Sequence, residues 1–254
     1  MFSDHPKGLK VLFYTELWER MSYYGMRGLL VLFMTASIAD GGLNYSNISA
    51  SAIYGIYAAS VYLVALPGGW IGDRILGQQK AIFFGGIIIT FGHFILAINY
   101  TSTFFLGLVF VVAGTGLLKP NISALVGALY EKKEDLKQSG FTLFYMAINV
   151  GSILGFFVCG YLGEKIGWHF GFSAAGVGMA FGIIHYKLSI PILGRVGLEP
   201  NLKISPERRS KEINYIFLLM GLFFVIFTLG LLGIVKFNPI PIAGILTVII
   251  TLIA

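Results

Sequence analysis

Four charged residues lie close together near the start of the chain, in a stretch that is otherwise apolar. Glu16, Glu19 and Arg20 belong to the run ELWERMSYYG (16–25), and Arg27 follows it. On a helix that turns 100° per residue, these charges, Tyr23 and Tyr24 fall within one arc of about 140°. Glu16 and Arg20 are one turn apart and can form an ion pair.

This combination of side chains can carry a proton and hold an anion. Desolvation favours the neutral form of a carboxyl group, whereas a nearby cation favours the ionised form. A guanidinium group can hold a carboxylate through two hydrogen bonds. We therefore interpret Glu16, Glu19 and Arg20 as part of a proton-linked binding site. The alternative is an ion pair between Glu16 and Arg20 that only joins two helices.

Membrane helices are predicted to position these residues. Of the 254 residues, 56% are hydrophobic and 12% are charged, whereas soluble domains carry about 25% charged residues. Apolar stretches of about 20 residues predict helices at 10–36, 50–72, 79–98, 103–128, 139–162 and 168–190. A charge at a helix centre costs about 2.5–3.5 kcal/mol. The charges of the first helix must therefore face a bundle interior or a water-filled cavity.

The basic residues are distributed unevenly between the two sides of this predicted bundle. With a cytoplasmic N-terminus, 13 of the 18 lysines and arginines lie in inside segments, and only Lys165 and Lys236 lie outside. The asymmetry predicts a cytoplasmic N-terminus. Together with the apolar stretches, it indicates a multi-pass protein of the cell inner membrane, with the lipid bilayer as its surroundings. It also explains the net charge of +6 without nucleic acid as a partner.

Further polar residues occur inside the other predicted helices. Lys119 lies within the fourth, next to Pro120, and Tyr62 lies within the second. Tyr145 and Asn149 are four residues apart and share a face of the fifth. Each could line a polar cavity or form a hydrogen bond between helices, and Lys119 could instead reach the cytoplasmic interface. Gly114 and Gly116 favour close helix packing.

Other classes of function find little support in the sequence. No nucleophile–base pair and no set of residues with metal-ligand spacing occurs, and the single cysteine, Cys159, lies in an apolar run. We therefore expect neither an enzyme nor a metal or organic cofactor. The coupling ion is expected to be the proton. A channel is disfavoured because the charges form mixed-sign pairs rather than rings of one sign.

The last part of the chain is predicted to differ from the bundle. Residues 191–212 form a basic cytoplasmic linker, and 213–254 are expected to form an extra transmembrane hairpin. The final apolar run, 240–254, has 15 residues, which span roughly 22 Å of a hydrocarbon core of about 30 Å. We therefore expect an incomplete helix and a longer parent protein, with a short re-entrant helix as the alternative.

Three motifs resemble signatures of the proton-dependent oligopeptide transporter family (POT or PTR) of the major facilitator superfamily. Residues 16–25 resemble its E-x-x-E-R-F motif and the following Tyr-Tyr-Gly, with Met21 in place of the usual phenylalanine. GLLKPNIS (116–123) and FTLFYMAINVGS (141–152) resemble its fourth- and fifth-helix motifs. GWIGDR (69–74), with Gly77 and Lys80, resembles the superfamily loop between helices two and three.

The resemblance implies an all-α polytopic membrane protein. Residues 1–190 would form the N-terminal six-helix bundle, built from two inverted three-helix repeats. The extra helices at 213–235 and from 240 onward would precede a missing C-terminal half that completes the cavity. The implied activity is proton-driven symport of di- and tripeptides into the cell.

The resemblance also implies roles for the polar residues singled out above. Arg20 and Lys119 would take part in proton coupling with Glu16 and Glu19 and would bind the carboxylate of the peptide. Asp73 and Arg74 would act in gating. The remaining cavity residues would be Arg27, Tyr24, Tyr62, Tyr145 and Asn149. An anion carrier of the same family, for example for nitrate, and a non-transporting assembly component remain the alternatives.

Overall fold

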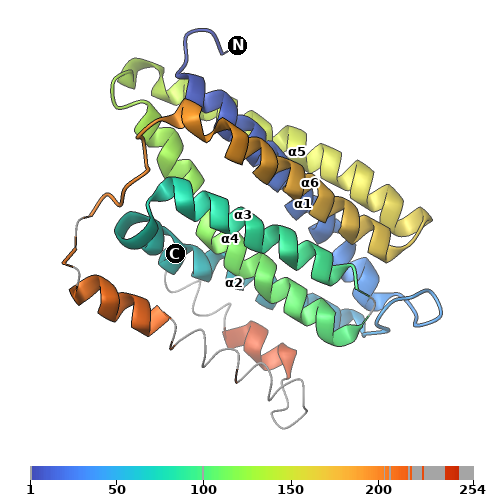
Figure 1. Ribbon diagram of the computed structural model, residues 1–254. Helices are drawn as coiled ribbons and strands as arrows, with labels where there is room; N and C mark the ends of the chain where they lie inside the picture. Colours follow the sequence, from blue (N-terminus) through green and yellow to red (C-terminus); the bar gives the residue numbers. More distant parts are fainter. Residues whose placement is uncertain are drawn as a thin grey trace.

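The structure is a computed structural model that describes residues 2–98, 100–202, 204–205, 207–216, 218, 225 and 238–245. Long helices that run side by side dominate this part of the chain (Figure 1). Each begins and ends within three residues of its predicted bounds, and the all-α prediction is confirmed. The six helices are α1 (Lys7–Thr35), α2 (Asn47–Ile71), α3 (Gln78–Leu96), α4 (Thr101–Leu129), α5 (Lys137–Lys165) and α6 (Trp168–Leu193).

Five helical segments of the described chain are long and apolar enough to span a membrane: 47–76, 78–96, 101–129, 134–165 and 168–193. The first of these joins α2 to the π-helical turn η1 (Gly72–Leu76), and the fourth includes the 3₁₀ turn η2 (Glu134–Leu136). Helix α1 has 29 residues, or roughly 44 Å at 1.5 Å per residue. It differs from the other five because charges interrupt its apolar sequence, and three of them, Glu16, Glu19 and Arg20, are buried against its neighbours.

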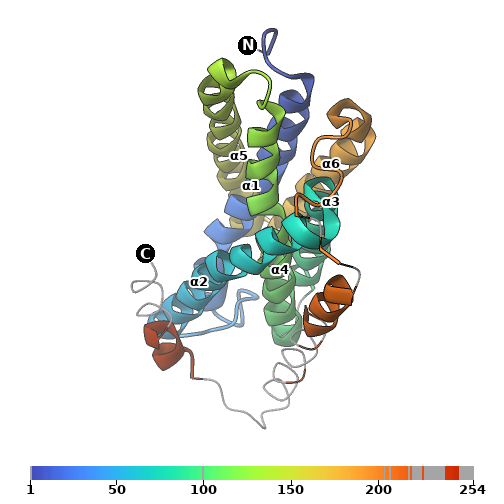
Figure 2. The ribbon, with the colours of Figure 1, turned by 90° about the vertical axis from the view of Figure 1, so that its left-hand side faces the viewer.

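The packing of the helices relates the first three to the last three. Helix α1 packs on α5 and α6, and α4 correspondingly packs on α2 and α3. If α1, α2 and α3 correspond to α4, α5 and α6, then α3 and α6 are equivalent helices. Their contact with each other joins the two repeats. In Figure 2, α3 and α6 lie on one side of the bundle and α2 and α5 on the other. This arrangement agrees with two inverted three-helix repeats.

Glycines allow α5 to approach α1 closely beside the charged residues. A Cβ atom on Gly151 would lie 2.9 Å from the Cβ of Arg20, and one on Gly155 would lie 2.8 Å from the backbone nitrogen of Gly25. On α4, Gly114 and Gly116 contact the backbones of α3 and α2 in the same way, as predicted. Small residues at these crossings bring the polar face of α1 under cover of its neighbours.

The segments predicted to face the cytoplasm meet at one end of the bundle. Near the N-terminus, His5 Nδ1 lies 2.6 Å from the hydroxyl of Tyr130, and Lys133 Nζ donates to the carbonyl of Asp4 at 2.8 Å. At the opposite end, the indole of Trp168 donates to the carbonyl of Asp40 at 2.9 Å. The loops therefore sort to the two ends of the bundle, as expected for successive helices that alternate in direction.

After α6, the described residues continue as a linker and two short helical stretches, 207–216 and 239–245. Helix 207–216 begins within the predicted linker, earlier than the expected start at 213. Most of the extra transmembrane hairpin predicted for 213–254 lies outside the described residues.

Candidate functional site

Three charged side chains of α1 meet inside the bundle. Glu16, Glu19 and Arg20 expose 2%, 0% and 3% of their surface. Arg20 Nε lies 3.0 Å from Glu16 Oε1 and also pairs with Glu19 Oε2. The predicted ion pair one turn apart is therefore present. The guanidinium group lies 5.0 Å from the centroid of the Tyr23 ring, where a cation–π contact adds to its binding.

Some polar atoms of this buried cluster have no hydrogen-bond partner in the part of the chain that the structure describes. Glu16 Oε2, Glu19 Oε1 and Arg20 Nη2 have no hydrogen-bond partner among the described residues. A buried polar atom without a hydrogen-bond partner costs free energy, because it has lost its contacts with water. In addition, the two carboxylates of the cluster share one adjacent guanidinium group. A single proton on the cluster would balance its charge. Such an arrangement can exchange a proton, which a simple ion pair between helices has no need to do.

Lys119 reaches the same region from α4. Its Nζ lies 4.9 Å from the centroid of the Tyr62 ring on α2. The ammonium attracts both Glu16 and Glu19 electrostatically, without forming a direct ion pair with either within the described chain. The side chain of Asn121, one residue after Pro120, donates to the carbonyl of Gly68 at 3.0 Å and fixes α4 against α2.

Arg27 lies farther along α1 and is held by tyrosines. Its Nε donates to the hydroxyl of Tyr54, and its guanidinium lies 5.1 Å from the Tyr54 ring centroid and 5.9 Å from that of Tyr23. Tyr57 stacks on Tyr23 at 6.4 Å, and its buried hydroxyl has no partner among the described residues. Arg27 and the Arg20 cluster are therefore joined through Tyr23.

The sequence reading did not single out Tyr54 or Tyr57. Both carry a hydroxyl group into an otherwise apolar helix, and a spacing of three residues places them on one face of α2. This spacing is the signal that could have identified them. Their pairing with Arg27 and Tyr23 depends on how α2 packs against α1.

The other predicted cavity residues are more open. Tyr62 and Tyr145 expose 63% and 53% of their surface, and Asn149 is also exposed. Asn149 Nδ2 donates to the carbonyl of Tyr145 at 3.4 Å within α5. In the described chain, no hydrogen bond or ion pair connects Tyr145 or Asn149 to the charged cluster. Tyr24 packs edge-on against Tyr23 at 5.2 Å.

Asp73 and Arg74 lie apart from this site, in η1 rather than in an open loop. The backbone N–H of Gly77 donates to the carbonyl of Gly72 at 2.9 Å, which gives the five-residue spacing of a π turn. Asp73 Oδ1 accepts from Asn201 at 3.0 Å, and Arg74 Nη1 lies 3.6 Å from a carboxylate oxygen of Glu212. These two residues thus hold the segment that follows α6.

The same junction has a further docking residue on α3. Gln79 Nε2 donates to the carbonyls of Gly194 and Val196, at 3.0 and 2.8 Å, and its backbone N–H donates to that of Gly197. The sequence reading did not identify Gln79, because its partners are more than 100 residues away. Within the described residues, no group of three or more His, Cys, Asp or Glu side chains is placed to hold a metal ion.

A sequence model of the POT family matches residues 79–206. The peptide transporter YePEPT of Yersinia enterocolitica is 41% identical over 257 aligned residues, which cover 98% of this chain and 50% of the relative. A di-/tripeptide transporter of Lactococcus lactis is 42% identical over 212 residues, covering 82% of this chain and 43% of its own length. The chain thus spans about half the length of these relatives.

Solved structures agree in fold. A crystal structure of the peptide transporter POT in complex with sulfate has a TM-score of 0.90 and 38% identity, and the match covers 100% of this chain and 52% of that one. A POT mutant in complex with alafosfalin has a TM-score of 0.83 and 39% identity, covering 90% and 47% of the two chains. These relatives are transporters rather than enzymes. With its membrane-length helices and these matches, this multi-pass membrane chain belongs to the POT family.

Proposed function

We propose that the protein containing this chain is a proton-coupled symporter that imports di- and tripeptides by alternating access. The observation that carries the proposal is the cluster of Glu16, Glu19 and Arg20, buried in the middle of a helix long enough to span the membrane. The relatives named as peptide or di-/tripeptide transporters support the choice of substrate. The anion carrier and the assembly component have no such support.

The proton and the substrate would act on the same cation. When the site is closed to water and holds no peptide, Arg20 pairs with the two glutamates. A peptide carboxylate that takes one of the guanidinium hydrogen bonds releases a glutamate, and the released carboxylate is more stable inside the bundle when it is protonated. Proton uptake and peptide binding would therefore favour each other.

Other residues would bind and enclose the peptide. Lys119 offers a second cation to the peptide carboxylate. Asp73 and Arg74 would act in gating through their contacts with the linker. The side chains proposed to line the cavity are Arg27, Tyr24, Tyr62, Tyr145 and Asn149. The exposure of Tyr62 and Tyr145 suits residues that meet either the peptide or the C-terminal half of the same transporter.

The proposal includes the organisation of the chain. Residues 1–190 would act as the N-terminal bundle, 191–212 as a basic linker on the cytoplasmic side, and 213–254 as part of an extra transmembrane hairpin. The location would be the cell inner membrane, with a cytoplasmic N-terminus. The distribution of lysine and arginine between the two ends of the bundle supports this orientation.

Uptake by the complete protein in liposomes tests the proposal. Radiolabelled dialanine should accumulate when the outside is acidic relative to the lumen, and a protonophore should abolish the accumulation. Nitrate should not accumulate under the same gradient. Absence of dipeptide uptake across a gradient that a fluorescent pH indicator shows to be intact would refute peptide symport, and accumulation of nitrate alone would favour the anion carrier.

A further inference from the structure

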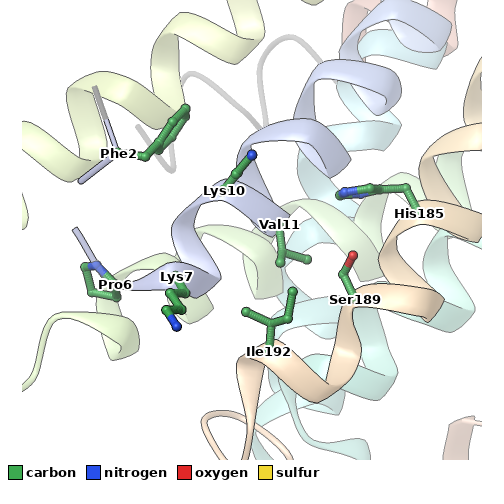
Figure 3. A pocket seen from close by; sticks show the side chains of 8 residues that line it. All are labelled: Phe2, Pro6, Lys7, Lys10, Val11, His185, Ser189 and Ile192. Carbon is green, nitrogen blue, oxygen red and sulfur yellow. The ribbon is translucent and has the colours of Figure 1, made fainter. Parts of the chain in front are cut away.

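A pocket separate from the charged cluster lies between the start of α1 and the end of α6. Its volume is about 540 Å³, within the range of about 300–1,000 Å³ typical of small-molecule sites. Figure 3 shows its side chains on both helices and on the segment before α1. The lining residues are Phe2, Pro6, Lys7, Lys10, Val11, His185, Ser189 and Ile192.

The charge of this pocket has one sign. Lys7 and Lys10 come from the first turn of α1, where the free backbone N–H groups add partial positive charge. His185 extends from α6 toward α1, and its ring packs edge-on against Tyr14 at 5.6 Å. None of the lining residues is acidic. Neither lysine forms an ion pair within the described chain, so both ammonium groups can bind an anion.

The wall formed by the N-terminal segment is tied to the bundle. The contacts of His5 with Tyr130 and of Lys133 with the carbonyl of Asp4 anchor this segment to the connection between α4 and α5. The ring of Phe2 packs against that of Phe13 on α1, with 5.4 Å between centroids. The pocket is therefore bounded by held elements.

The apolar half of the pocket continues onto the outer surface of α6. Phe2, Val11 and Ile192 line the pocket itself, and Leu188, one helical turn before Ile192 on α6, exposes 76% of its surface. A free phosphate ion would make no use of such a wall. A phospholipid would place its phosphate beside the lysines and its acyl chains along α6.

We propose that this pocket binds the headgroup of an anionic phospholipid at the end of the bundle that carries the N-terminus. Basic pockets between transmembrane helices on the cytoplasmic side are suited to anionic headgroups. Lys7 and Lys10 bind the phosphate, Ser189 and His185 can donate further hydrogen bonds, and Val11 and Ile192 contact the glycerol and upper acyl chains. The lipid would thereby hold the end of α6 against the start of α1.

Native mass spectrometry of the complete protein, titrated with phosphatidylglycerol or phosphatidylcholine, tests this site. Each basic residue near an anionic lipid contributes about fivefold in affinity. Lys7→Gln/Lys10→Gln should therefore weaken phosphatidylglycerol binding about thirtyfold. The matched variant Lys80→Gln/Lys132→Gln removes two exposed lysines outside the pocket and should change the affinity less than threefold.

A second variant tests the cavity without a change in charge. Ser189→Phe should fill the pocket and weaken phosphatidylglycerol binding by at least tenfold, while the elution volume and lipid-free thermal midpoint stay unchanged. Equal affinity for the two lipids, equal losses in the two lysine variants, or full binding by Ser189→Phe would each overturn the proposal. Inorganic phosphate that competes at the concentration of the lipid would identify a free-anion site instead.

Discussion

Arg20 Nε lies 3.0 Å from Glu16 Oε1 while the same guanidinium group pairs with Glu19, so one cation serves two buried carboxylates on a single helix. Three charges within five residues are a local arrangement that requires no second helix. The neighbouring helices supply burial, close glycine crossings and the more distant ammonium of Lys119. The cluster is therefore preformed on α1 and enclosed by what surrounds it.

Replacing Glu19 by glutamine should separate proton coupling from substrate exchange. Glutamine keeps the size of the side chain but cannot release a proton, so gradient-driven dipeptide uptake should fall to background. Counterflow exchange, which needs no net proton movement, should retain most of its rate. The exposed Glu164 provides the control, and Glu164→Gln should affect neither assay. Equal loss of both activities in Glu19→Gln would assign Glu19 a structural role.

Replacing Arg20 by glutamine should destabilise the protein, because two buried carboxylates lose their cation. Breaking a buried ion pair from one side costs roughly 3–5 kcal/mol. The free energy of unfolding in detergent should fall by this amount, whereas the exposed Arg195→Gln should leave it unchanged. The triple variant Glu16→Gln/Glu19→Gln/Arg20→Gln should recover part of the loss. A single variant as stable as the parent would contradict a charged, paired cluster.

Tyr54→Phe should remove the hydrogen bond to Arg27 and keep the ring beneath the guanidinium group. A hydrogen bond to a charged group contributes about 1.5–3 kcal/mol. Arg27 is only half-buried, so we expect a loss of about 1.5 kcal/mol in the free energy of unfolding. Tyr100, which is 71% exposed, offers a control in Tyr100→Phe. An unchanged stability for Tyr54→Phe would show that water replaces the tyrosine hydroxyl.

The close crossing of α1 and α5 predicts opposite responses at two glycines of the same helix. Gly155→Ala places a methyl group 2.8 Å from the backbone nitrogen of Gly25, and such overpacking costs about 1–3 kcal/mol. A Cβ on Gly160 meets nothing within 4 Å, so Gly160→Ala should be neutral or stabilising by up to about 1 kcal/mol. Thermal unfolding midpoints measure the difference. Equal midpoints would mean that the two helices lie farther apart.

The linker after α6 should loosen when its contacts with η1 are removed. Asp73→Ala/Arg74→Gln deletes the hydrogen bond from Asn201 and the ion pair with Glu212. At about 1 kcal/mol for a lost hydrogen bond, opening should increase about fivefold, and trypsin should cleave within 195–211 correspondingly faster. Lys80→Gln, nearby on α3, should leave the cleavage rate unchanged. Unaltered cleavage in the double variant would show that the remaining contacts, those of Gln79 and of Arg209 with the carbonyl of Ile75, hold the linker.

Much of the fold could be predicted from the sequence because a bilayer imposes a simple rule on each segment. A stretch that crosses the membrane must be apolar, long and helical, so the bounds of the six long helices α1 to α6 were predictable to within three residues. The charged arc of α1 was equally predictable, since residues 16, 19 and 20 are neighbours on any helix. The contact between Arg20 and Glu16 follows from local geometry alone.

Contacts between distant segments depended on the tertiary structure. Three contacts join residues on different elements. Arg27 donates a hydrogen bond to the hydroxyl of Tyr54, the ammonium of Lys119 lies over the ring of Tyr62, and Gln79 donates to carbonyls of the linker. Helical periodicity assigns a side chain to a face, but crossing positions and close glycine contacts decide which face it meets. The sequence by itself determined the helices and the charges of α1, and packing decided which residues of other helices surround those charges.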